Sequence, residues 1–237
     1  MTNDAVKVHK MHNIAARSLL VLALFLPSPS LAKDPLRILV MGDSFMTSNG
    51  SAGSAVPSLL RRDLQANVQS RAVTGARFVY RLPITGALGM NIAKQYRPGP
   101  WDFVVMNGGG NDLWMGCGCT RCRKRLNRLI SPDGRKGEIP SAVNTARKSG
   151  AKVIYVGYLR SPGLGSPIEH CRKVGDALEA RINVMAKQDA GISFVSLADM
   201  VPHGDRSFHA ADMIHPSPKG SAAATKRIAQ AIRNIKK

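Results

Sequence analysis

The sequence predicts an α/β fold in which helices cover both faces of a five-stranded parallel sheet. Short runs rich in apolar residues alternate with longer stretches of helical periodicity, and this alternation recurs five times. No internal repeat or long low-complexity linker interrupts the pattern, which indicates one folded domain over residues 33–237. Ligands of such folds bind beyond the carboxyl ends of the strands, so functional residues are expected in the loops that follow the strands.

Each expected element follows from a local pattern. Strands are predicted at Arg37–Met41, Val68–Val73, Phe103–Met106, Lys152–Tyr158 and Ile192–Leu197. Helices are predicted at Val56–Leu64, Ile139–Ser149, Glu169–Gln188 and Ser217–Ile235, with Glu169–Gln188 the longest amphipathic one. Pro57 suits the first turn of its helix, and Gly150 is a typical helix stop. The stretch 113–138 fits no regular pattern and forms a basic, cysteine-rich insert.

Charge is the unusual feature of the composition. The chain has 34 Lys and Arg against 15 Asp and Glu, a net charge of +19, and its 44% hydrophobic content is that of a globular protein rather than a disordered one. Such a surface favours anionic partners, for example an anionic polymer of the cell envelope. No nucleic-acid-binding module is recognisable, so no nucleic-acid partner is expected.

The first 32 residues have the layout of a secretory signal peptide. A basic start precedes the apolar run Leu19–Leu26, and small residues flank a cleavage-like position after Ala32. The run is too short for a membrane-spanning helix, which needs roughly 20 apolar residues. The alternative is an uncleaved interfacial helix. Cleavage removes three basic residues and Asp4, a net +2 of the total +19, so the exported domain keeps +17.

Four cysteines lie in the predicted exported part: Cys117, Cys119, Cys122 and Cys171. In an oxidising compartment this even count predicts two disulfides. A bridge from Cys117 to Cys119 would close a very short, strained loop, so pairings in which one clustered cysteine reaches Cys171 are favoured. The alternative is a four-thiolate zinc site, because Cys119 and Cys122 have ligand-like spacing.

Three loops after predicted strands carry candidate catalytic residues. Ser44, in Gly42-Asp43-Ser44, could present its hydroxyl at the sheet edge. Gly75 follows the second strand, where glycine lets a backbone N–H approach a ligand. Asn111 follows the third strand, where an amide N–H could stabilise an oxyanion together with backbone N–H groups.

The segment Asp212-Met213-Ile214-His215 supplies a possible base and its partner. A serine nucleophile needs a base, and the base needs a group that fixes its tautomer. Asp and His three residues apart can meet on one turn. His170 is a competing histidine, and Asp199 with His203 and Asp205 with His209 are rival pairs at wider spacing.

Together these four segments resemble the SGNH (GDSL) hydrolases, a family of esterases and lipases. The resemblance runs from about Arg37 to the C-terminus and implies a three-layer α/β/α sandwich of flavodoxin-like type. It implies Ser44 as nucleophile, His215 as base and Asp212 as its partner. It also implies an oxyanion hole made by the Ser44 and Gly75 backbone N–H groups and the Asn111 side chain.

Two features depart from the family pattern. Phe45 stands where the family usually has Leu, and the insert around Cys117–Cys122 has no counterpart in the family core. Gly86 and Gly89 are rivals for the second-block glycine, with Gly75 preferred because it follows a predicted strand.

The predicted function is therefore an exported serine esterase that needs no cofactor and no metal. Its substrate would be an ester in an acylated polysaccharide, a lipid or a small molecule. The alternative is a non-catalytic cell-envelope binding domain that uses its basic face on an anionic polymer.

Overall fold

The computed structural model describes residues 1–2, 34–80, 84–163 and 165–236. The predicted signal peptide lies almost wholly outside the described residues and stays a prediction. Asp34–Lys237 forms one compact unit, and the account below concerns this unit. Among the described residues, no helix combines the length and apolar character needed to cross a membrane.

Five parallel strands form one sheet, as predicted, in the order β2-β1-β3-β4-β5. The strands are β1 (Arg37–Met41), β2 (Asn67–Ser70), β3 (Phe103–Met106), β4 (Lys152–Val156) and β5 (Ile192–Val195). The chain passes from β1 to β2 on one side and then crosses to β3 on the other. The loops after β1 and β3 therefore diverge at a topological switch point, where open α/β sheets bind their ligands.

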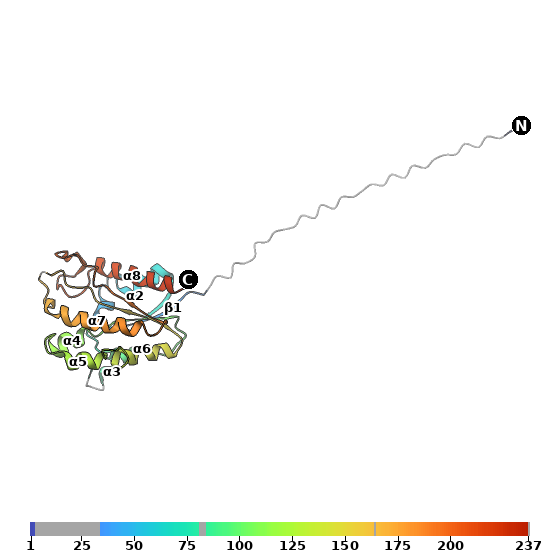
Figure 1. The fold of residues 1–237 in the computed structure, drawn as a ribbon. Helices are drawn as coiled ribbons and strands as arrows, with labels where there is room; N and C mark the ends of the chain where they lie inside the picture. Colours follow the sequence, from blue (N-terminus) through green and yellow to red (C-terminus); the bar gives the residue numbers. More distant parts are fainter. Residues whose placement is uncertain (3–33, 81–83, 164, 237) are drawn as a thin grey trace. The chain divides into compact units, whose positions relative to one another are not determined.

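Helices and short helical turns connect the strands (Figure 1). The α-helices are α1 (Ser44–Thr47), α2 (Val56–Leu64), α3 (Ile84–Ala87), α4 (Gly110–Cys117), α5 (Arg123–Leu129), α6 (Glu138–Lys148), α7 (Arg172–Ala186) and α8 (Pro218–Lys236). The 3₁₀ turns are η1 (Ile92–Gln95), η2 (Glu169–Cys171) and η3 (Arg206–Phe208).

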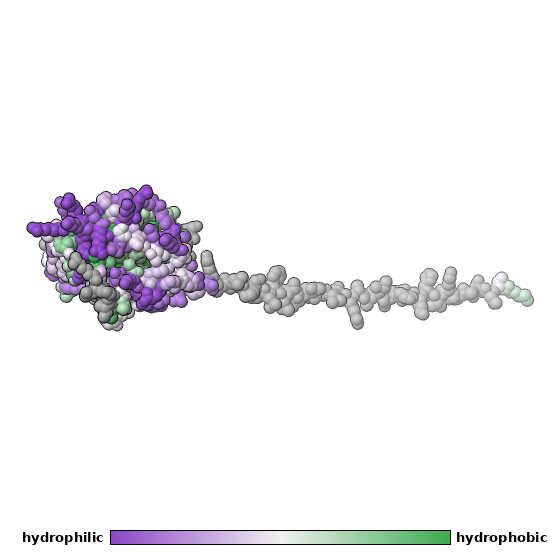
Figure 2. Space-filling model, turned by 90° about the horizontal axis from the view of Figure 1, so that it is seen from below, coloured by the Kyte–Doolittle hydropathy of each residue, from purple (hydrophilic) through white to green (hydrophobic). Residues whose placement is uncertain are grey.

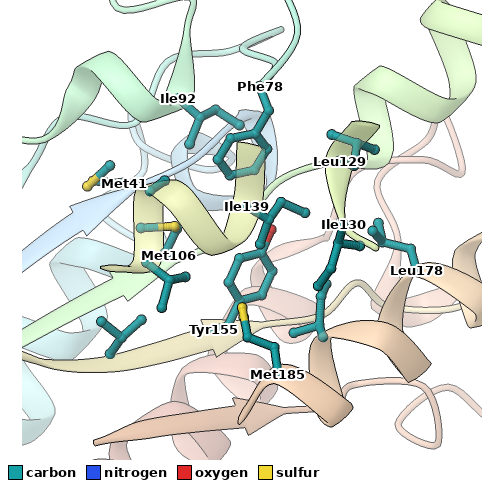
Figure 3. Close-up of a cluster of buried hydrophobic side chains, with 14 of the residues drawn as sticks. Met41, Phe78, Ile92, Met106, Leu129, Ile130, Ile139, Tyr155, Leu178 and Met185 are labelled. Atoms are coloured by element: carbon teal, nitrogen blue, oxygen red, sulfur yellow. The ribbon is translucent and has the colours of Figure 1, made fainter. Parts of the chain in front are cut away.

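The alternation of side chains along the strands builds a core on each face of the sheet. Leu39, Met41, Val104, Met106 and Tyr155 belong to the cluster covered by α4–α7. Tyr155 lies among the side chains of this cluster, between Ile139 and Met185 (Figure 3). Its hydroxyl donates to the carbonyl oxygen of Gly108 at 3.0 Å, so the buried polar atom is satisfied.

The opposite face packs against α2 and α8. Ile38, Val40 and Val105 from the strands join Leu60 of α2 and Ile228 of α8 in a second buried cluster. The face of the domain seen in Figure 2 is mixed, with hydrophilic regions beside smaller hydrophobic ones. The three layers match the predicted α/β/α sandwich.

Several strand ends differ from the prediction, because a strand ends where its partner does. The second strand was expected to reach Val73 but ends at Ser70, since Ser70 pairs with Val40 and β1 is finished one residue later. The fourth and fifth strands were expected to reach Tyr158 and Leu197. They end at Val156 and Val195, which face each other in the register.

One helix prediction was also wrong. The expected helix Glu169–Gln188 divides into a 3₁₀ turn, Glu169–Cys171, and α7, Arg172–Ala186. The longest helix in the described part of the chain is α8, with 19 residues against 15 in α7. The predicted insert 113–138 contains the end of α4, a cysteine-rich turn and α5.

Candidate active site

Ser44 is placed by the sharp turn between β1 and α1. Gly42 has φ +146°, and a Cβ atom there would overlap the side-chain oxygen of Asn107, so this turn requires glycine. Asp43 then caps α1, because its Oδ1 accepts from the backbone N–H of Phe45 at 3.0 Å. Ser44 is consequently the first residue of α1, directly beyond the carboxyl end of β1.

The structure brings Ser44, His215 and Asp212 into one hydrogen-bonded chain. Oγ of Ser44 and Nε2 of His215 are 2.9 Å apart, and Nδ1 of His215 is 2.6 Å from Oδ2 of Asp212. Asp212 only accepts when ionised, so Nδ1 carries the proton and Nε2 is left to accept from the serine hydroxyl.

The turn from Asp212 to His215 holds this geometry. Oδ1 of Asp212 accepts from the backbone N–H groups of Ile214 and His215, each at 3.0 Å, and Met213 between them has φ +56°. Burial raises the pKa of Asp212, but hydrogen bonds from the His215 ring and from these two N–H groups outweigh that effect. They lower the pKa of Asp212 to about 2.

The rival aspartates are engaged elsewhere. Asp199 pairs with Arg227, and Asp205 accepts from Ser207 and Lys219, so neither rival aspartate bonds to a histidine in the described chain. His209 is only 7% exposed, and burial lowers its pKa. Nε2 of His170 lies 3.8 Å from the sulfur of Cys171.

Three N–H donors are candidates for an oxyanion hole. Among the described residues, the backbone N–H groups of Ser44 and Gly75 have no acceptor. Nδ2 of Asn111, in the first turn of α4, donates to the carbonyl oxygen of Ala76 at 3.1 Å. Its contact with Oδ2 of Asp43 is long, at 3.5 Å, so the second N–H of this amide is only weakly engaged.

Contrary to the prediction, Gly75 does not directly follow the second strand, because β2 ends at Ser70 and Gly75 lies further along the loop. A different observation favours it: Gly75 precedes Ala76, whose carbonyl accepts from Asn111. Gly86 lies within α3, and the carbonyl oxygen of Gly89 accepts from Gln95 at 2.8 Å.

The sequence analysis missed a buried polar group beneath Ser44. Asp43 is 1% exposed, and its carboxylate accepts from the hydroxyl of Tyr158 at 2.6 Å and from Nδ2 of Asn107 at 3.2 Å. Tyr158 in turn accepts from the backbone N–H of Gly110 at 3.2 Å. Burial raises the pKa of Asp43, while its hydrogen bonds act in the opposite direction. Asn107 follows β3 directly, and that position could have marked it as a candidate.

The four cysteines form two disulfides, Cys117–Cys122 and Cys119–Cys171. Cys119 is thus the clustered cysteine that reaches Cys171. The sulfurs of Cys119 and Cys171 lie near the His170 ring, in a grouping of metal-ligand residue types. Because both sulfurs are in a disulfide, they are not the thiolates that a zinc site needs.

Comparison with known proteins identifies related folds. Residues 40–223 match the model of the GDSL-like lipase/acylhydrolase family. A candidate SGNH hydrolase from Slackia heliotrinireducens superimposes with a TM-score of 0.56 at 24% identity, over 84% of this chain and 100% of that one. The crystal structure of TesA gives a TM-score of 0.57 at 21% identity, over 84% and 99% of the two chains.

A third structural neighbour is a family two carbohydrate esterase from Clostridium thermocellum in complex with cellohexaose. Its TM-score is 0.55 at 16% identity, over 86% of this chain and 66% of that chain. At these identities the structural neighbours show the fold. A search of curated proteins finds no match.

Proposed function

Because the chain belongs to the GDSL-like lipase/acylhydrolase family and is an ester-acting hydrolase, we propose that it is an exported serine esterase with Ser44 as nucleophile. The observation that carries this proposal is the 2.9 Å contact between Oγ of Ser44 and Nε2 of His215, residues 171 positions apart in the sequence. The second contact, from His215 to Asp212, supplies the orienting partner that such a base needs.

The reaction begins when Oγ of Ser44 attacks the ester carbonyl carbon and Nε2 of His215 takes the hydroxyl proton. Ionised Asp212 stabilises the imidazolium that forms. Collapse of the tetrahedral intermediate breaks the bond to the alcohol oxygen, which receives the proton from His215. Water then attacks the acyl-enzyme by the same proton path, releases the acid and restores Ser44.

The proposed oxyanion hole comprises the backbone N–H groups of Ser44 and Gly75 and the side chain of Asn111. These donors are held by the chain before substrate arrives, which is what makes such groups effective as negative charge develops on the oxygen. Asn111 is fixed through Ala76, and Ser44 through the cap at Asp43.

The proposed substrates are carboxylic esters, including esters of carbohydrates. The family match and the carbohydrate esterase among the structural neighbours support this class. The mechanism uses only side chains and backbone groups described above, with no cofactor in any step.

Export is supported by two features of the chain. The N-terminal residues have the layout of a signal peptide, and both pairs of cysteines are joined as disulfides, which persist in oxidising compartments. The proposed location is the periplasm or the medium.

Hydrolysis of p-nitrophenyl acetate by the purified mature chain tests this function. We expect Ser44→Ala and His215→Ala each to lower kcat by roughly 10³ or more while the protein stays folded. His209→Ala is the matched control, because His209 is a nearby histidine for which no hydrogen bond to Ser44 is found among the described residues. Loss of activity in His209→Ala with activity kept in His215→Ala would show that the base is wrongly assigned.

A further inference from the structure

We infer that a pocket walled by the Cys119–Cys171 disulfide selects esters that carry an apolar group about as large as benzene. This inference rests on the proposed function of Ser44. Ser44, Asn111 and His215 line the same cavity as the two cysteines. A group attached to the reacting carbonyl, on its acyl or its alcohol side, can therefore enter it.

The walls of the cavity come from the insert and from the start of α7. They include Leu113, Trp114, Cys119, Cys171, Val174 and Leu178. The disulfide ties the turn after α4 to the residue that precedes α7, so it fixes the distance between the two walls. The cysteine-rich insert, which has no counterpart in the family core, thus borders the space beside the proposed nucleophile.

The size of the cavity limits what it accepts. Its volume is about 140 Å³. A protein cavity of roughly 150 Å³ lined by apolar side chains holds one benzene molecule. A group of similar bulk, such as the chain of a hexanoyl or hexyl ester, fills the space, and a much longer chain does not fit inside.

The charged residues around the cavity favour an apolar occupant over a carboxylate or an amine. Arg160 is already paired with Glu179 at 2.8 Å and with Asp176 at 2.7 Å. Arg172 is paired with Glu169 at 3.2 Å. A charged substrate group would have to displace one of these partners, whereas an apolar group gains by leaving water.

Gly175 keeps the pocket open. It lies in α7, lines the cavity, and a Cβ added there would have no neighbouring atom within 4 Å. Its φ is not in the positive range, so a larger residue strains no backbone and improves the helix propensity of this position. Gly175→Leu would occupy the cavity from the helix side.

Two series of esters test the selectivity and identify which side of the ester enters the pocket. One series is the methyl esters from acetate to decanoate, and the other is the acetates of alcohols from methanol to decanol. We expect kcat/KM to rise about fourfold per methylene in one of the two series, the gain from burying each group, and to stop rising near the hexyl length. The series that responds identifies the acyl or the alcohol side.

Gly175→Leu should lower the ratio of kcat/KM for the hexyl-length ester to that for methyl acetate by at least about tenfold. Asn183→Leu is the matched control, because it adds the same side chain to an exposed position of α7 outside the pocket and should leave the ratio unchanged. Thermal unfolding checks that the variants fold. Should Gly175→Leu fail to fold, Gly175→Ala should lower the ratio in the same direction by a smaller factor.

Failure of this inference is distinguishable from failure of the esterase proposal. Hydrolysis with equal kcat/KM along both series, or an unchanged ratio in folded Gly175→Leu, contradicts the pocket and leaves Ser44 as nucleophile. Absence of hydrolysis for every ester in both series contradicts the proposed function and the pocket together.

Discussion

The side chain of Asn111 donates a hydrogen bond to the carbonyl oxygen of Ala76 at 3.1 Å. This contact joins the first turn of α4 to the loop after β2. It therefore links the segment that carries Asn111 to the segment that carries Gly75, and both residues are proposed oxyanion donors. Their alignment therefore depends on the packing of two loops that are separate in sequence.

Asn111→Ala should leave KM nearly unchanged and lower kcat by about 10²–10³, because an oxyanion donor acts mainly in the transition state. Asn111→Asp should be at least as damaging, since it replaces an N–H donor with a carboxylate that faces the developing anion. Steady-state kinetics on several esters measures both effects. A wild-type kcat in Asn111→Ala would mean that the oxyanion is held by other groups.

Asp112 is a positioning residue for the same loop. It is 1% exposed, and its carboxylate accepts from the backbone N–H groups of Phe78 at 2.9 Å and Val79 at 2.8 Å. Asp112→Ala should lower the free energy of unfolding by about 1–3 kcal/mol, because two buried N–H groups lose their acceptor. It should also lower kcat more than it changes KM, as the donors lose their alignment.

Urea unfolding and steady-state kinetics measure these two effects of Asp112→Ala. Asp133→Ala is the control, because Asp133 also accepts from a backbone N–H, that of Arg135, but on the exposed surface. If Asp112→Ala is destabilised while its kcat is unchanged, Asp112 holds the fold and not the donors.

Asp212 should contribute to the rate by orienting the His215 ring. With a pKa of about 2 it is ionised at every pH at which the enzyme is assayed, so it can accept from Nδ1 of His215 throughout that range. In Asp212→Ala this orienting contact is gone, and kcat should fall, but by less than in Ser44→Ala. Steady-state kinetics of the two variants measures the difference. A wild-type kcat in Asp212→Ala would remove Asp212 from the proposed triad.

The two disulfides should differ in their effect on stability. Cys119–Cys171 closes a loop of 52 residues and Cys117–Cys122 one of 5, and a longer loop restricts the unfolded chain more. Replacing Cys119 and Cys171 together by Ser should cost about 2–5 kcal/mol, and replacing Cys117 and Cys122 should cost less. Urea unfolding of the two double variants makes the comparison, and the reverse order would contradict it.

Thiol labelling tests the pairing itself. The exported chain, denatured without a reductant, should give almost no adduct, and peptide mapping should recover the same two pairs. Four reactive thiols together with stoichiometric zinc would replace the disulfides with a metal site.

The sequence predicts the parts of this site that depend on local order along the chain. Ser44 after a strand, and His215 on one turn with Asp212, are candidates from local order, and the resemblance to the SGNH hydrolases singles them out. The structure brings them together. The end of β2 could not be predicted, because the length of its partner β1 decides it. The role of Tyr158 depends on the approach of the end of β4 to α1, a tertiary contact that leaves no pattern near Tyr158. The cavity beside Gly175 could not be predicted from the sequence either, because it forms only when α7 packs beside α4.

The central claim, that Ser44 is the nucleophile, is tested most directly by mapping the adduct of a serine-reactive fluorophosphonate. We expect one phosphonate per chain, on the peptide that contains Ser44, with hydrolysis lost in proportion to labelling. Ser44→Ala should take up none, and His215→Ala should react far more slowly because the hydroxyl lacks its base. An adduct on a different serine, or hydrolysis that continues in fully labelled protein, would contradict the assignment.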